Sequence, residues 1–229
     1  MLHPLCARKM KMVTLSGSVV IIGIWGDYMN DIVLKGILKD IESSHSIDGI
    51  SFDKAKLITK RSNGDEDVIN LRFKTFSNKY KENDEIALKG NIRSYSYKVA
   101  EDKNKVVIYV FTYFDEPEEV EESVTNKVVL DGRICKINEL RTVKNNKQNI
   151  HFILANNLTS TDGTKRLNSY IPCIAWNNLA REMSKLSVNT KLQLKGELHS
   201  REYKKIHDNG EVEIRVAHEL MVLGYEVLE

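Results

Sequence analysis

The sequence predicts an all-β protein made of two small closed β-barrels in tandem. Two observations predict this class. The chain repeats one set of segments in the same order, and most of its apolar residues alternate with polar ones, which is the period of a strand with one buried face. The length of 229 residues suits one or two domains. No apolar run approaches the ~18 residues that a membrane-spanning helix needs.

The repeat is carried by three pairs of segments. They are 30–36 with 126–132 (offset 96), 50–59 with 150–159 (offset 100), and 83–98 with 189–204 (offset 106). The last pair shares the pattern N-x-x-[IL]-x-L-K-G-x-[IL]-x-S-x-x-Y-K. Because the segments keep their order while the offsets grow slowly, we interpret them as a duplication with small insertions.

These matches divide the chain into four parts. Residues 29–114 form domain 1, and residues 126–229 form domain 2. Between them, residues 115–125 hold six acidic residues, one proline and no basic residue, which predicts a solvated linker. Residues 1–28 do not continue the strand pattern. We expect them to be a leader outside the fold, with Met29 opening the first strand.

The elements of domain 2 follow in order along the chain. Alternation predicts strands around 128–130 and 152–154, and over 170–176, 192–198 and 212–223. Apolar residues at i, i+4 and i+7 predict a short amphipathic helix over 177–186, with Asn177 or Asn178 as its N-cap. The Asn-Gly pair at 209–210 predicts a hairpin between the last two strands.

Three strands, a helix and two strands in about 100 residues is the order of the OB-fold, a five-stranded Greek-key barrel. Gly132 and Gly196 fall in mid-strand, where barrel strands bend sharply. Domain 1 keeps the five strands and has a shorter helix region at 77–82. We therefore predict two tandem OB-folds, each with one short helix.

The sequence lacks the usual signatures of catalysis. It has no Gly-rich phosphate loop ending in Gly-Lys-Ser/Thr and no G-x-S-x-G turn, and Val222 stands where a zinc-protease helix would need histidine after His218-Glu219. Its three cysteines, Cys6, Cys135 and Cys173, are too few for a disulfide framework or a Cys₄ metal site. We predict a cytoplasmic protein that is not an enzyme and needs no metal or cofactor.

Aromatic residues on strands stand beside basic residues in both domains. In domain 2, Arg201 and Tyr203 lie on the strand face opposite the buried leucines. Tyr170 and Trp176 share one parity on another strand, so both can lie on one face. Such rings stack nucleic-acid bases while neighbouring cations hold phosphates. Phe52 and Phe152, by contrast, fit the pattern of core packing.

Domain 2 resembles the bacterial single-stranded DNA-binding protein family over the whole of 126–229. The resemblance rests on N-K-V-V-L-D-G-R at 126–133, F-I-L-A at 152–155, the strand from Tyr170 to Trp176 followed by N-N-L-A, and G-E-L-H-S-R-E-Y at 196–203. In that family, aromatic residues at the positions of Tyr170, Trp176 and Tyr203 stack bases.

Domain 1 matches the family less well. Tyr97 aligns with Tyr203 and Phe76 with Trp176, whereas Asn70 stands where Tyr170 would be. We therefore expect domain 2 to bind DNA more strongly than domain 1.

The resemblance implies non-catalytic, largely sequence-independent binding and protection of single-stranded DNA in replication, recombination or repair. It implies a nucleoid-associated protein without membrane contact, and a homodimer with four OB domains. The base-stacking candidates are Tyr170, Trp176, Tyr203, Phe76 and Tyr97. The phosphate-binding candidates are Arg133, Lys136, Arg141, Arg201, Lys204, Arg72, Arg93 and Lys98.

Two alternatives remain open from the sequence. One is an OB-fold adaptor for protein interaction, of the primosome or plasmid-maintenance type, with weak nucleic-acid binding; the modest charge of +4 on domain 2, the weak aromatic set of domain 1 and the acidic linker favour it. The other is an OB-type RNA binder, since fold alone does not decide the function. The chain ends at Glu229, directly after the last predicted strand, so we expect no recruitment of enzymes through an acidic C-terminal tip.

Overall fold

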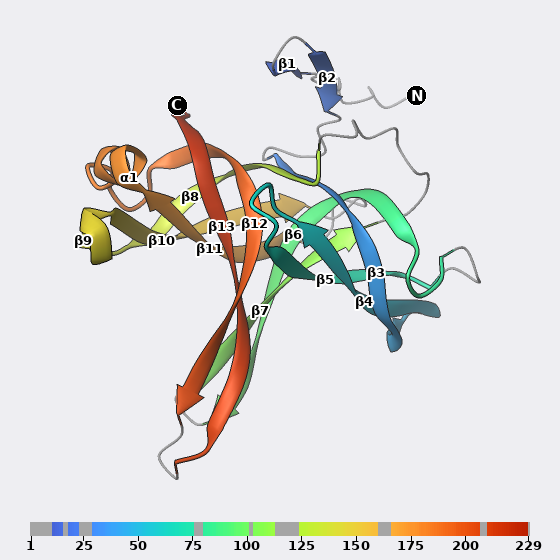
Figure 1. Cartoon of the computed structure of the whole chain (residues 1–229). Helices are drawn as coiled ribbons and strands as arrows, with labels where there is room; N and C mark the ends of the chain where they lie inside the picture. The colour runs from blue at the N-terminus through green and yellow to red at the C-terminus, as the bar shows by residue number, and fades with distance from the viewer. Residues whose placement is uncertain are drawn as a thin grey trace.

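The structure is a computed structural model that describes residues 11–15, 18–22, 29–75, 80–100, 103–112, 124–159, 166–206 and 210–228. Within these residues strands account for nearly all regular structure, with one α-helix and one 3-10 turn. The predicted all-β class is confirmed (Figure 1). No helix in the described residues is long and apolar enough to cross a membrane.

The first closed unit, which we call barrel 1, contains five strands. They are β3 (Asn30–Ile47), β4 (Ile50–Lys60), β5 (Glu66–Lys74), β6 (Glu85–Ala100) and β7 (Lys103–Thr112). The strands pair in the circuit β3-β4-β5-β7-β6, and β6 pairs back onto β3. Only the β5–β7 pairing in this circuit is parallel. The shorter helix predicted at 77–82 falls partly on residues 76–79, which lie outside the described residues.

The second closed unit, barrel 2, has the same circuit. Its elements are β8 (Asn126–Ile137), β9 (Arg141–Thr142), a 3-10 turn (Lys144–Asn146), β10 (Gln148–Thr159), β11 (Arg166–Trp176), α1 (Asn177–Met183), β12 (Lys191–Ile206) and β13 (Val212–Val227). The predicted helix is present but ends at Met183, and its N-cap is Trp176, which makes no capping side-chain hydrogen bond. The predicted caps, Asn177 and Asn178, lie within the helix.

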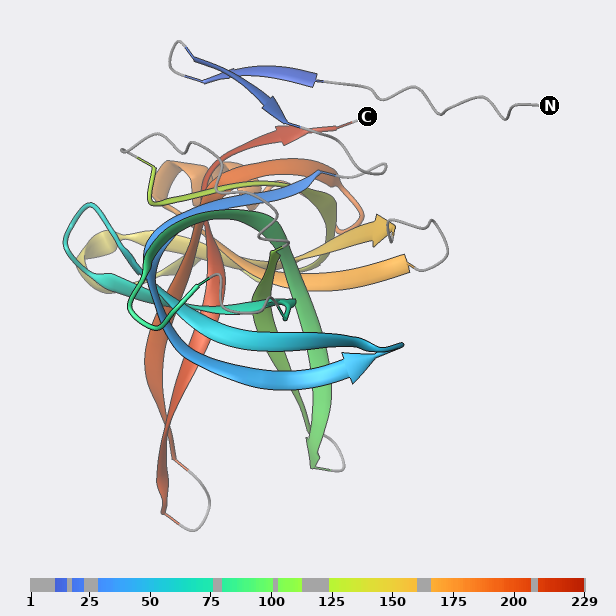
Figure 2. The same cartoon turned by 90° about the vertical axis from the view of Figure 1, so that its right-hand side faces the viewer.

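The two barrels share one sheet. Residues 30–34 of β3 pair antiparallel with residues 126–130 of β8, and this pairing joins both circuits into an 11-stranded sheet. The hairpins β6–β7 and β12–β13 both project to the same side of the molecule (Figures 1 and 2). We call the β3–β8 contact the seam.

The repeated asparagine at the start of each barrel has the same role in both. Asn30 Nδ2 donates to the carbonyl oxygen of Ile92 at 2.7 Å, and Asn30 Oδ1 accepts from the amide of Ile92 at 2.7 Å. Asn126 makes the same two bonds to Leu198, at 2.8 and 3.0 Å. Each asparagine therefore ties the first strand of its barrel to the fourth, which explains why this residue recurs in the repeat.

Part of the predicted leader forms strands. β1 (Lys11–Leu15) and β2 (Ser18–Ile22) pair with each other in a separate two-stranded sheet, drawn in dark blue in Figure 1. The sequence pattern did not indicate this strand pair. The rest of residues 1–28 lie outside the described residues.

Two close strand crossings fix how the repeats correspond. A Cβ atom on Gly36 would collide with the carbonyl oxygen of Ile58, and a Cβ on Gly132 would lie 2.6 Å from that of Ala155. Ile58 and Ala155 therefore occupy the same place in the two barrels. The true offset in this strand is 97, and the predicted offset of 100 is wrong.

The corrected offset differs from the predicted one by three residues, an odd number, so each residue of the strand moves to the opposite face. In β4 the buried residues are Ala55, Leu57 and Thr59, so Phe52 lies on the outer face, whereas Phe152 is 2% exposed inside barrel 2. The prediction of core packing is confirmed for Phe152 and wrong for Phe52.

The third strand also shifts. Leu71 pairs with Val110 as Cys173 pairs with Leu220, which sets an offset of 102. Val68 rather than Asn70 then stands in the place of Tyr170. Lys74 rather than Phe76 corresponds to Trp176, and Phe76 itself lies outside the described residues.

We expect Asp31→Asn to stabilise the protein at neutral pH. Burial raises the pKa of Asp31 to about 6, and the charge of Asp131 adds to this rise while Lys89 opposes it. A carboxyl whose pKa is raised by folding costs stability as the pH climbs from about 4 through about 6. The substitution should therefore add ~1–3 kcal/mol at pH 7.5 and little at pH 4. Thermal melts at the two pH values check this, and a loss of stability at pH 7.5 would show that the attraction of Lys89 outweighs burial.

Candidate nucleic-acid interface

The outer surface of β10, β11, β13 and β12 gathers the predicted stacking residues of barrel 2, and we call it face 2. The strand registers place Tyr170 and Trp176 of β11 on the same side as Tyr203 of β12. Tyr170 is 50% exposed and Tyr203 is 38% exposed. Trp176 is half-buried at the end of β11, directly before α1. The structure therefore brings the three rings onto one face.

One predicted cation lies beside Tyr203, and another points away from it. The guanidinium carbon of Arg201 is 5.7 Å from the centroid of the Tyr203 ring. Lys204 is opposite Ile214 on the other face of the hairpin, because successive strand residues alternate. Lys205, which was not among the candidates, shares the face of Tyr203. Lys98 in barrel 1 likewise lies on the face away from Tyr97.

Three other candidates border face 2 on the side of β8 and β9. Arg133 and Lys136 are exposed on β8, where they pair with β10. Arg141 of β9 is opposite Asn149, which is itself opposite Trp176. All three cations therefore lie at the edge of the face.

A carboxylate that no sequence pattern predicted lies in the middle of face 2. Glu219 of β13 lies opposite His199 of β12. Its Oε1 is 3.5 Å from Nε of Arg201, and its Oε2 is 3.8 Å from Nδ1 of His151. A row of side chains thus runs across face 2 from Tyr203 through Arg201 and Glu219 to His151.

The outer surface of β4, β5, β7 and β6 is the corresponding face of barrel 1, and we call it face 1. Tyr95 is at its centre, with ring centroids 6.2 Å from Tyr97 and 5.8 Å from Tyr109. The guanidinium carbon of Arg72 lies 4.5 Å from the Tyr95 ring and 4.9 Å from the Tyr109 ring. Three tyrosines and one arginine thus form a continuous surface, with Tyr97 42% exposed.

A second aromatic group continues face 1 toward β4. The guanidinium carbon of Arg93 is 4.1 Å from the Phe111 ring, and Phe52 is 6.2 Å from Phe111. His45 stacks on Phe52 at 5.0 Å. The candidates Arg72 and Arg93 therefore both lie against aromatic rings, an arrangement in which rings and cations can contact one nucleic-acid strand together.

The expectation that domain 1 has a weak aromatic set is not supported by this geometry. Sequence reasoning missed Tyr109, Phe111 and Phe52, and did not include Tyr95 among the stacking candidates. One signal was available: Tyr95 and Tyr97 on one strand, and Tyr109 and Phe111 on the next, each recur at the two-residue spacing of a single strand face.

Each hairpin is anchored on the opposite barrel by a serine. Ser200 of β12 accepts a hydrogen bond at Oγ from the amide of Val68 at 2.8 Å, and Ser94 of β6 accepts one from the amide of Tyr170 at 2.7 Å. Val68 and Tyr170 are equivalent in the repeat, so these two bonds are copies of each other. They hold the base of each hairpin against the other barrel.

On one side this anchor includes a buried ion pair. Asp67 is 0% exposed, and its carboxylate accepts from Nε of Arg61 at 2.8 Å and from the amide of Ser200 at 2.5 Å. Burial alone would raise the pKa of Asp67, but the bonds from Arg61 and Ser200 outweigh it and leave the pKa below its usual value. Asp67 is therefore ionised and fully engaged at neutral pH.

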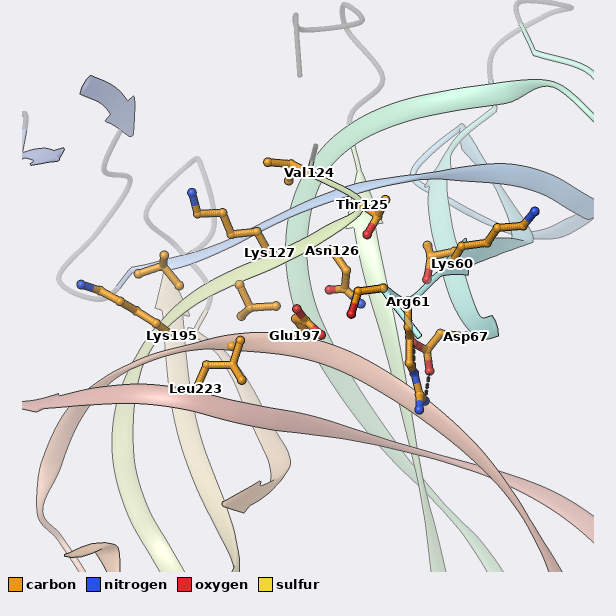
Figure 3. A pocket seen from close by; sticks show the side chains of 15 residues that line it. Lys60, Arg61, Asp67, Val124, Thr125, Asn126, Lys127, Lys195, Glu197 and Leu223 are labelled. Atoms are coloured by element: carbon orange, nitrogen blue, oxygen red, sulfur yellow. Dashed lines mark hydrogen bonds and ion pairs between the residues drawn. The ribbon is translucent and has the colours of Figure 1, made fainter. Parts of the chain in front are cut away.

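A groove of about 340 Å³ follows the seam next to this ion pair. Arg61 and Asp67 form one wall, and Lys127 and Lys195 lie on the other (Figure 3). Within the described part of the chain, Lys60, Lys127 and Lys195 make no ion pair. Lysines without carboxylate partners can hold phosphates, so the groove is a further anion-binding candidate.

The chemistry of these surfaces is that of contact rather than reaction. Burial raises the pKa of the Cys173 thiol and, to a smaller extent, that of Cys135, so neither is an activated nucleophile. Among the described residues no three His, Cys, Asp or Glu side chains gather in a way that could hold a metal ion. What the faces offer is exposed rings beside guanidinium groups.

Comparison with known proteins agrees with this surface chemistry. The profile of the single-strand binding protein family matches residues 125–223. This region belongs to that family. The match covers barrel 2 from the seam to the last strand, and therefore includes Tyr170, Trp176 and Tyr203. No curated protein matches the chain.

Two solved structures share the fold over most of the chain. The wild-type single-stranded DNA binding protein from Thermus aquaticus has 18% sequence identity and a TM-score of 0.65, covering 89% of this chain and 95% of that one. A deletion variant of the Thermus aquaticus protein has 17% identity and a TM-score of 0.64, covering 88% and 95%. At this identity the likeness shows the fold alone, and it extends over both barrels.

Proposed function

We propose that the chain binds single-stranded DNA through faces 1 and 2, without catalysis and with little overall dependence on sequence. The observation that carries this proposal is the placement of exposed rings beside arginines on the outer face of each barrel. Each ring that stacks a base contributes ~1–3 kcal/mol, and every base has a face to stack. Arginines and lysines at the edges, and the lysines of the seam groove, neutralise the phosphates.

The biological role follows from the family of barrel 2. We propose that the protein covers and protects single strands during replication, recombination or repair, in the bacterial cytoplasm and on the nucleoid. We further propose that both barrels, 29–114 and 126–229, are copies of one OB-fold, with residues 1–28 outside them. The two-residue aromatic pattern of face 1 supports a share of the binding for barrel 1 at least equal to that of barrel 2.

Tyr203→Ala is expected to weaken binding of oligo-dT about 5- to 150-fold, which corresponds to the ~1–3 kcal/mol of one stacked base. Tyr203→Phe should lose far less, because the ring and not the hydroxyl does the stacking. Since the side chain is partly exposed, the melting temperature of both variants should change little. Fluorescence titration and thermal melts on the same samples check this. A Tyr203→Ala protein that melts early but binds normally would assign Tyr203 to the fold instead.

We propose that two chains associate into a homodimer with four barrels. A strip of exposed apolar side chains lies on the face of the β12–β13 hairpin opposite Tyr203, formed by Ile206, Val212, Ile214 and Val216. Apolar strips of this kind mark protein contacts. Sedimentation equilibrium should give the mass of two chains, and Ile214→Lys should shift it toward one. A wild-type monomer would instead favour the adaptor function, with the strip serving another protein.

A further inference from the structure

A surface that only holds phosphates would not carry a carboxylate, because the two negative groups repel each other. Face 2 nevertheless carries Glu219. It lies in the middle of face 2, and its side chain is 17% exposed. In barrel 1, Tyr109 pairs with Arg93 as Glu219 pairs with His199, so a stacking ring occupies the equivalent position. Barrel 2 therefore carries a carboxylate at the centre of face 2, where barrel 1 carries a ring.

The carboxylate is held in position but not saturated. Arg201 lies 3.5 Å from one oxygen and His151 lies 3.8 Å from the other. Within the described residues neither oxygen accepts a hydrogen bond, whereas an ionised carboxylate can accept about four. Arg201 and His151 on its two sides keep Glu219 oriented and leave its two oxygens able to accept from a third group.

That third group is the edge of a base. A base stacked on one of the rings of face 2 presents N–H donors at its edge, and a carboxylate accepts such donors selectively. Guanine is the base that presents two adjacent donors, N1–H and the N2 amino group, which match the two oxygens of a carboxylate. Cytosine and adenine place a ring-nitrogen acceptor beside their amino group, and thymine flanks its single N–H with two carbonyl oxygens. Each of these three would bring a lone pair against Glu219.

We propose that Glu219 gives face 2 a preference for guanine, by accepting N1–H and N2–H from a base stacked on that face. The inference rests on the proposed single-stranded DNA binding and adds a base-reading position to it. Face 1, with Tyr109 in the same place, should have no such preference.

The test compares three oligonucleotides on the full chain. The first is oligo-dT, the second carries isolated guanines at regular intervals, and the third carries hypoxanthine at the same positions. Hypoxanthine keeps N1–H and lacks the N2 amino group. The wild-type chain should bind the guanine strand about 5-fold or more tightly than oligo-dT, because one bidentate pair of this kind discriminates by at least that factor. Hypoxanthine should recover only part of the gain.

Glu219→Gln should abolish the difference between the guanine strand and oligo-dT. The matched control is Glu213→Gln, on the same strand and the same face, where the carboxylate is paired with Arg215 at 2.7 Å. The control should keep the guanine preference, since Glu213 is already engaged.

Three results would overturn the inference. A wild-type chain with equal affinity for all three strands has no base-reading position. A Glu219→Gln chain that binds all three strands more tightly by one common factor shows that Glu219 only repels phosphates. A wild-type chain that binds no oligonucleotide refutes the proposed function itself, and this outcome is distinct from the first two, in which DNA is bound.

Discussion

Asp67→Ala is expected to lower the free energy of unfolding by about 3–5 kcal/mol, the usual cost of removing one partner of a buried ion pair. Asp67 is fully buried between the barrels, where it engages both Arg61 and the backbone of Ser200. Its loss leaves the guanidinium of Arg61 and the amide of Ser200 without their acceptor. Urea denaturation at pH 7 measures the change.

Asp65→Ala is the matched control for this prediction. Asp65 lies in the same connection, and its Oδ2 is 3.8 Å from Nη1 of the same Arg61, but its side chain is 65% exposed. An exposed pair of this kind contributes little, so the control should stay within ~0.5 kcal/mol of the wild type. Equal stability of the two variants would show that the Asp67 ion pair does not hold the barrels together.

The stability that Asp67 contributes should also depend on pH, in a direction set by its lowered pKa. Because the pKa of Asp67 is lowered by folding, its contribution is complete above about pH 4 and is lost as the pH falls through its folded pKa. The gap between the wild type and Asp67→Ala should therefore be wide at pH 7 and narrow as the solution becomes strongly acidic.

Simultaneous replacement of Tyr95 and Tyr97 by alanine is expected to weaken oligo-dT binding by roughly 30- to 1000-fold. Each ring contributes ~1–3 kcal/mol to binding when it stacks a base. The contributions of two rings in contact are not additive, so we expect the combined loss to stay below twice the upper value for one ring. Arg72 loses its aromatic partner at Tyr95 as well. Titration of the full chain with oligo-dT measures the change.

Two controls separate binding from folding in that experiment. Replacement of both tyrosines by phenylalanine keeps the rings and should keep most of the affinity. The second control is Val106→Ala. Val106 lies on the same hairpin but on its other face, opposite Ser96, so this variant should bind as the wild type does. A folded double-alanine variant with unchanged affinity would remove face 1 from the DNA interface.

The strand order of each barrel could be predicted from the sequence, because the alternation of apolar residues and the repeat can both be recognised within one β-strand at a time. The correspondence of Tyr97 with Tyr203 is confirmed: each faces a cation of the adjoining strand, Lys105 or Arg215, in the same register. This segment lies between bulges, so counting residues gives the right answer.

Counting fails across bulges. The pairing of β3 with β4 shifts twice, between Lys39 and Glu42 and between Ser43 and His45, and that of β10 with β8 shifts once. Each bulge changes the number of residues between equivalent positions without changing the alternating pattern. Because the error in the offset was an odd number of residues, the prediction placed Phe52 in the core instead of on the outer face.

Contacts between the barrels could not be predicted from the sequence, for a different reason. Asp67 and Ser200 are 133 positions apart, and nothing in either local pattern marks the aspartate as buried. The same holds for Glu219, whose neighbours Arg201 and His151 come from two other strands. Strand periodicity predicts which face a side chain occupies, but only the closed barrels show what it meets there.

The central claim, that rings and cations of the two faces bind single strands, is tested most directly by the salt dependence of oligo-dT affinity on the full chain, followed by tryptophan fluorescence. If about four to six cations contact phosphates, the slope of about −0.7 per contact predicts that log K falls by roughly 3–4 for each tenfold rise in salt. Quenching should accompany binding as a base stacks on Trp176. An affinity that does not change with salt, or the absence of binding at low salt, would contradict the account.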